Sequence, residues 1–149
     1  MKMETQTTVT IGAGAGFIWL LGIYFVGILI TKGKFGTALI APIAAVVSLT
    51  IHEYAHAAVA KMLGVVAPVI DVTDFSGLTH MSGFNPNSPE GFLILAAGPA
   101  SNIIMTWLAW KYLKNRREVM WMVIGVNLLL IWLSYNEPNG DIRRMFNLQ

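Results

Sequence analysis

The fold is decided by residues 36–63, which read GTALIAPIAAVVSLTIHEYAHAAVAKML. Up to position 51 this stretch has no charged side chain and no histidine, and His52, Glu53 and His56 follow directly. An α-helix rises about 1.5 Å per residue, so roughly 20 apolar residues cross the hydrocarbon core of a bilayer. The stretch therefore predicts a membrane-spanning helix that carries polar chemistry in its second half.

Three further apolar stretches have no charged residue: Ile11–Ile30, Gly91–Trp110 and Val119–Asn136. Of the 149 residues, 55% are hydrophobic and only 12% are charged, whereas soluble domains carry about 25% charged residues. We therefore expect an all-α polytopic membrane protein with about four transmembrane helices in the lipid bilayer. The net charge of +2 argues against a nucleic-acid partner, and the absence of cysteine excludes disulfides and thiolate sites.

The polar connection 64–90 separates the second and third spans. Within it, residues 69–73 and 78–81 are β-prone, and Phe75-Ser76-Gly77 is typical of a turn, so we predict a small β-hairpin there. We interpret residues 1–149 as a single membrane domain. In it, residues 1–36 contain an uncleaved N-terminal anchor helix, 37–141 form the core and 142–149 form a tail.

Four crossings put the N-terminus, the 64–90 connection and the tail on one side of the membrane. The other side then holds six of the ten cationic residues, namely Lys32, Lys34, Lys111, Lys114, Arg116 and Arg117. Since cytoplasmic loops are enriched in Lys and Arg, this distribution weakly favours the cytoplasm for the side with six.

His52-Glu53-Tyr54-Ala55-His56 is an HExxH motif. On a helix, residues i and i+4 share one face, so both imidazoles can bind one zinc ion, with the glutamate beside them as a general base. Each ionisable residue in a bilayer helix costs about 2.5–3.5 kcal/mol on insertion scales. A bound cation would offset that cost, although a polar patch satisfied by neighbouring helices is the alternative.

Catalytic zinc takes three protein ligands and leaves one position open. The third ligand should come from the side of the membrane nearest the histidines. We favour Asp141 first and Glu137 second, because both lie in the Pro/Gly-broken turn after the last span. The remaining candidates are Asp71, Asp74, His80 and Glu90.

Gly98-Pro99-Ala100-Ser101-Asn102 lies in the third span. Pro99 removes a backbone donor and tends to bend the helix, while Gly98 permits close approach of another helix. Asn102 is either an interhelical hydrogen-bonding group or an active-site amide, and its depth beside the histidines favours the second reading.

Together, the HExxH motif, the GPxxN motif at Gly98–Asn102 and the Asn/Pro/Asp ending at 136–141 resemble the site-2 protease family of intramembrane zinc metalloproteases. The resemblance covers about residues 37–141. It implies a three-helix catalytic core, a membrane-associated β segment and hydrolysis of peptide bonds in transmembrane helices of membrane-protein substrates.

By position, the resemblance implies that His52, His56 and Asp141 bind Zn2+. It also implies that Glu53 is the catalytic base and Asn102 an active-site amide. We expect this amide to help stabilise the oxyanion. The active-site end would face the cytosol of a prokaryotic cell membrane, opposite to the weak Lys/Arg indication.

The third motif departs from the family pattern, because Asn136, Pro138 and Asp141 are closely spaced and Gly140 precedes the aspartate. A catalytically inactive metal-binding membrane scaffold of the same fold is therefore one alternative. A small transporter with an intramembrane polar pathway is the other.

Overall fold

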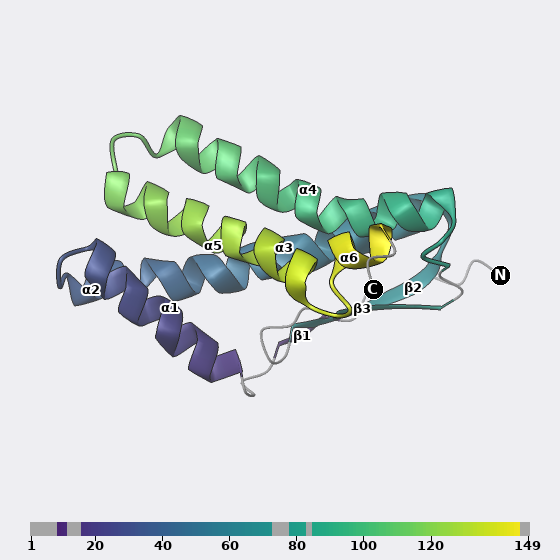
Figure 1. Cartoon of the computed structure of the whole chain (residues 1–149), viewed down its shortest axis with the longest axis horizontal. Coiled ribbons are helices and arrows are strands. Elements are labelled where there is room, and N and C mark those ends of the chain that lie inside the picture. Colours follow the sequence, from purple (N-terminus) through teal and green to yellow (C-terminus); the bar gives the residue numbers. More distant parts are fainter. Residues whose placement is uncertain (1–8, 12–15, 73–77, 83–84, 147–149) are drawn as a thin grey trace.

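Three long helices lie side by side and form the body of the protein (Figure 1). The computed structural model describes residues 9–11, 16–72, 78–82 and 85–146. In chain order its elements are β1 (Val9–Ile11), α1 (Gly16–Ile30), α2 (Phe35–Ala38), α3 (Ile40–Met62), β2 (Val66–Val72), β3 (Leu78–Ser82), α4 (Pro89–Tyr112), α5 (Arg117–Asn136) and α6 (Asp141–Met145).

Three of the described helical segments are long and apolar enough to cross a membrane: Phe35–Met62, which joins α2 and α3, then α4 and α5. They coincide with the three later spans predicted from the sequence and fit a multi-pass membrane protein. Each keeps a large apolar surface exposed, as a lipid-facing helix must. α4 begins where Ser88 caps the helix, its hydroxyl accepting from the Gly91 N–H at 3.0 Å.

The prediction of a first membrane span at Ile11–Ile30 is wrong in its start and its length. Ile11 lies in strand β1, and helix α1 covers only the 15 residues Gly16–Ile30. Val9, Thr10 and Ile11 are β-branched and favour a strand. A helix of this length rises about 22 Å, which is less than the roughly 30 Å of a bilayer core. Three candidate spans and a shorter apolar helix thus replace the expected four.

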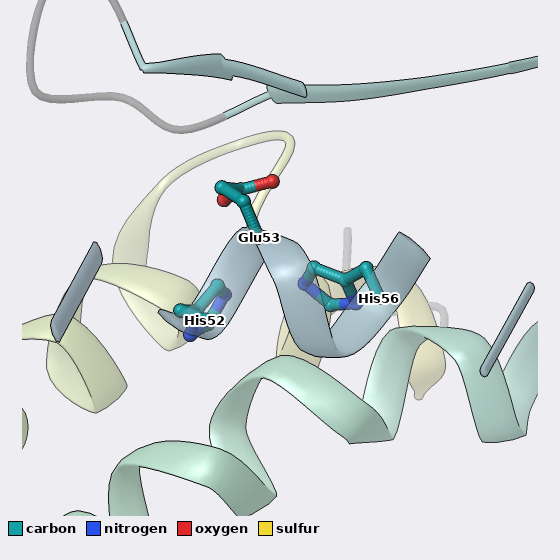
Figure 2. A group of neighbouring side chains, drawn as sticks. All are labelled: His52, Glu53 and His56. Carbon is teal, nitrogen blue, oxygen red and sulfur yellow. The ribbon is translucent and has the colours of Figure 1, made fainter. Parts of the chain in front are cut away.

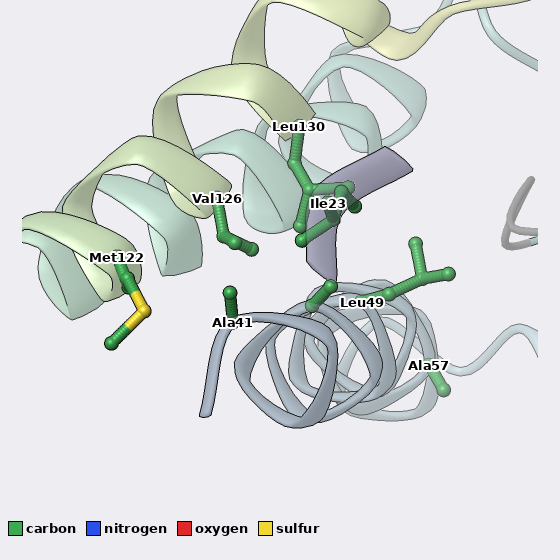
Figure 3. Close-up of a cluster of buried hydrophobic side chains, with 8 residues drawn as sticks. Ile23, Ala41, Leu49, Ala57, Met122, Val126 and Leu130 are labelled. Atoms are coloured by element: carbon green, nitrogen blue, oxygen red, sulfur yellow. The ribbon is translucent and has the colours of Figure 1, made fainter. Parts of the chain in front are cut away.

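The main apolar core joins α1, α3 and α5 (Figure 3). Its buried members are Ile23, Ala41, Ala45, Leu49, Ala57, Met122, Val126 and Leu130. Ala41, Ala45 and Leu49 of α3 fall at i, i+4 and i+8, so they form one face of that helix. Small side chains on this face let the helices approach closely, which brings the second half of α3 against its neighbours.

A three-stranded sheet with the order β1-β2-β3 lies at one end of the bundle, near α6 (Figure 1). β1 pairs parallel with β2, and β2 pairs antiparallel with β3. The turn expected at Phe75-Ser76-Gly77 lies outside the described residues. The connections α1–α2 and α4–α5 lie at the opposite end, where Lys34 Nζ contacts Glu118 Oε1 at 3.0 Å.

Candidate metal centre

His52 and His56 lie one helical turn apart in the second half of α3. Figure 2 shows both rings on the side of α3 that faces α4, with Glu53 projecting away from α4, toward the strands. The ring centroids are 4.9 Å apart at an interplanar angle of 79°. All three residues are buried, with at most 4% of their surface exposed. The HExxH spacing thus presents two imidazoles together inside an apolar bundle.

Gly98 of α4 forms the wall against which both rings pack. A methyl group in place of its hydrogen would overlap the Nε2 atoms of His52 and His56, and would lie 2.6 Å from His56 Cε1. The close approach expected of Gly98 is therefore made with the two rings, and glycine is required because any larger side chain would fill the space of the ligand atoms. Ala100, by contrast, is exposed.

Both rings are held through their Nδ1 atoms, so both Nε2 atoms face the site. His56 Nδ1 lies 2.6 Å from the carbonyl oxygen of Ile94, to which it donates. His52 Nδ1 lies 2.8 Å from Asn102 Nδ2. Pro99 has no backbone N–H, so the carbonyl of Leu95 loses its hydrogen-bond donor within the helix. The carbonyl that binds His56 is not this one but that of Ile94. Outer partners of this kind fix ring orientation at metal sites.

Asp141 approaches both rings from α6. Its Oδ2 lies 2.9 Å from His52 Nε2 and 3.2 Å from His56 Nε2. Burial opposes ionisation of this carboxyl, but hydrogen bonds from His52 and His56 outweigh it and hold its pKa well below the usual range. The structure thus brings together the first-choice third ligand and both histidines, which lie 89 and 85 residues away in the chain.

A tight turn between α5 and α6 delivers Asp141. The Gly140 N–H donates to the Glu137 carbonyl at 2.9 Å, and a methyl group on Gly140 would overlap the carbonyl of Ser134. The glycine before the aspartate, which departs from the family pattern, is therefore what lets the chain fold back onto α5. Phe146, just after α6, packs edge-to-face against Phe92 of α4, with the ring centroids 6.2 Å apart. This contact ties the short helix to α4.

Glu53 is the second carboxylate near the rings. One ligand atom each from His52, Glu53 and His56 lies within 4.8 Å of the other two. Glu53 shares a helix with the histidines but points to a different side of it in Figure 2, toward the strands. Asp141 has the more direct approach to both Nε2 atoms.

The donor set fits a divalent metal. A tetrahedral zinc ion with bonds of about 2.0–2.2 Å separates its ligand atoms by about 3.3–3.5 Å. The carboxylate oxygen of Asp141 lies 2.9 and 3.2 Å from the two Nε2 atoms, so an outward shift of a few tenths of an ångström admits the ion. Two imidazoles and a carboxylate are also ligand types that zinc accepts.

The other candidate ligands are placed less favourably or not described. Glu137 is exposed at the end of α5, and Glu90 is exposed in the first turn of α4. Asp71 lies in β2 and His80 in β3, paired strands whose backbone alone is described. Asp74 lies outside the described residues.

Sequence reasoning missed the Ile94 carbonyl as the partner of His56. No side-chain pattern marks it, because any residue at position 94 supplies the same backbone oxygen. Its only sequence signal is position, one helical turn before Gly98, where α4 crosses the HExxH face.

A family model described as Peptidase M50B-like matches residues 21–140 of the chain. No curated protein and no solved structure shows significant similarity to it. The matched segment runs from α1 through α5 to the turn before Asp141 and contains both histidines, Glu53, Gly98 and Asn102.

Proposed function

Because the chain belongs to the Peptidase M50B-like family, and so to the site-2 proteases that it resembles, we propose that it is an intramembrane zinc-dependent endopeptidase. Its substrates would be membrane proteins, cleaved at peptide bonds in or near a transmembrane helix. The family suggests a metallopeptidase, and the group His52, Glu53 and His56 could hold a metal ion. Zinc and the cleavage of transmembrane helices are the parts that we propose.

The convergence of three ligand atoms carries the proposal. Both histidine Nε2 atoms lie within 3.2 Å of Asp141 Oδ2, inside a bundle whose surface is apolar. Gly98 leaves room for both rings at this point. His52, His56 and Asp141 would hold the zinc ion, which takes three protein ligands in a catalytic site.

Bound there, zinc would supply Lewis acidity, which lowers the pKa of a coordinated water to about 7 and polarises a peptide carbonyl. Glu53 would take the proton from the attacking water and later pass it to the leaving amine. His52, His56 and Asp141 would hold position throughout, because backbone and side-chain partners fix both rings. The buried setting makes the charge on Glu53 more effective than it would be in water.

The sheet suggests how a substrate is presented. A helical peptide bond is shielded by its own hydrogen bonds, so the substrate must unwind locally before cleavage. β3 pairs with β2 along one edge, and both strands lie against α3, which carries the histidines. An unwound substrate strand that adds to the β3 edge would be recognised through main-chain hydrogen bonds with little sequence preference.

Glu53→Gln tests the proposal directly. Purified protein in liposomes, with a labelled single-span substrate, should give cleavage products for the wild type and none for the variant. Both should bind close to one zinc ion per chain, measured by plasma mass spectrometry, since glutamine keeps the size of the side chain and leaves the three ligands intact.

Three results would contradict the proposal. Full activity of Glu53→Gln would remove this residue as the base. A wild type that binds zinc but cleaves no substrate would identify the chain as a metal-binding scaffold of the same fold. Ion flux in the same liposomes without products would favour the transporter reading.

A further inference from the structure

The side-chain amide of Asn102 is the feature that the proposed chemistry does not yet use. Asn102 is completely buried in α4. Its Nδ2 lies 2.8 Å from His52 Nδ1, while its Oδ1 has no hydrogen-bond partner among the described residues. An amide oxygen buried without a partner loses its hydrogen bonds to water with no replacement, so this orientation calls for an explanation.

The two histidines differ in what their outer partner can do. A backbone carbonyl only accepts, so Ile94 requires a proton on His56 Nδ1. An amide can either donate or accept. With Nδ2 toward the ring, Asn102 donates to Nδ1 of a neutral His52, whose proton then lies on Nε2 and is directed at Asp141 Oδ2, 2.9 Å away.

That tautomer of His52 has no Nε2 lone pair to offer a metal ion. Turning the amide by 180° exchanges Oδ1 and Nδ2, two groups of nearly equal size. Oδ1 then accepts from Nδ1–H, and Nε2 is free to bind the ion. Asn102 can therefore stabilise either of two states of His52 without moving the helix backbone.

We propose that Asn102 is a positioning residue that sets the tautomer of His52: its Oδ1 accepts the Nδ1 proton in the zinc-bound protein, and its Nδ2 donates to Nδ1 in the zinc-free protein. This inference rests on the proposed zinc site but not on proteolysis. It replaces contact with the oxyanion as the function of Asn102, because the amide lies at Nδ1, on the side of the ring opposite the ligand atom.

Three variants separate this function from simple packing. Asn102→Leu keeps the approximate size but removes the acceptor. Asn102→Asp keeps an acceptor in the same place. Asn127→Leu is the matched control, since Asn127 is an equally buried asparagine whose amide bonds to Ser48 and to its own helix.

Zinc affinity, measured by competition with a chelating dye in detergent, is the first readout. Loss of an outer partner typically weakens metal binding by about 10- to 100-fold. We expect a loss in that range for Asn102→Leu, retention within about threefold for Asn102→Asp, and no change for Asn127→Leu. Wild-type affinity in Asn102→Leu, or equal losses in Asn102→Leu and Asn102→Asp, would overturn the proposal.

The tautomer itself can be observed by 15N NMR of histidine-labelled wild-type protein, so this readout does not depend on the folding of an Asn102 variant. The chain has three histidines, so His52 can be assigned by substitution of the other two. We expect the proton on Nε2 without zinc and on Nδ1 with zinc. A His52 that keeps one tautomer in both states refutes the proposal. Zinc binding without cleavage would instead refute the protease function and leave the tautomer result standing.

Discussion

Gly98→Ala should damage the metal site far more than it damages the fold. The added methyl group overlaps the Nε2 atoms of both His52 and His56 and lies 2.6 Å from His56 Cε1. Both rings are also held from behind, His56 by the Ile94 carbonyl and His52 by Asn102. The overlap therefore falls on the ligand atoms themselves, which must turn away or force α3 and α4 apart.

The expected size follows from the cost of overpacking, about 1–3 kcal/mol for an extra carbon in a filled site. If this cost is paid only when the rings occupy their binding positions, zinc affinity falls by about 5- to 150-fold, because 1.4 kcal/mol corresponds to about tenfold. The thermal stability of the zinc-free protein should change less than the zinc affinity does. Inside a helix, alanine is about 1 kcal/mol more favourable than glycine, and this offsets part of the overpacking cost.

Gly125→Ala is the matched control. Gly125 lies within α5, and a methyl group there meets no atom within 4 Å. This variant should keep wild-type zinc affinity and unfold at an equal or higher temperature. Zinc titration and thermal unfolding in the same detergent measure both quantities. Wild-type zinc affinity in Gly98→Ala would refute the arrangement of the two rings against α4.

Three further predictions concern the remaining parts of the site. Asp141→Ala should lose zinc and cleavage together, whereas Glu137→Ala should keep both, as metal content and product formation will show. Gly140→Ala should weaken zinc binding by displacing α6, because its methyl group overlaps a carbonyl of α5, and zinc titration measures the loss. Zinc at about 100 times its Kd should stabilise the wild type by about 2.7 kcal/mol; chelation should abolish this increment in thermal unfolding, and Asp141→Ala should show none.

Features of the fold that depend on composition and local periodicity were predictable. α4 and α5 coincide with uncharged runs long enough to span a bilayer, and the cluster Asn85–Pro89 marks the start of α4, where Ser88 caps the helix. The resemblance to the site-2 proteases, read from the HExxH and GPxxN motifs, is confirmed by the family match. Each of these signals lies within a few adjacent residues.

The predicted start of the first helix, at Ile11, was wrong because apolar character alone does not distinguish a strand from a helix. Val9–Ile11 pairs with residues 70–72 of β2, a contact between distant segments that the sequence of either one does not specify. The same limit applies to the partner of Asn102. Its depth in the membrane indicated a position near His52, but only the packing of α4 on α3 shows which ring atom it contacts.

The candidate metal site is closed by α6, a segment that does not belong to the membrane-spanning helices. The side chains of His52 and His56 are 5% and 4% exposed, whereas that of Asp141 is 19% exposed. Asp141 on α6 is therefore the most exposed of these three side chains. α6 has only five residues and is fixed by the turn at Gly140 and the Phe92–Phe146 contact, so loss of either anchor should impair metal retention without disturbing the three-helix core.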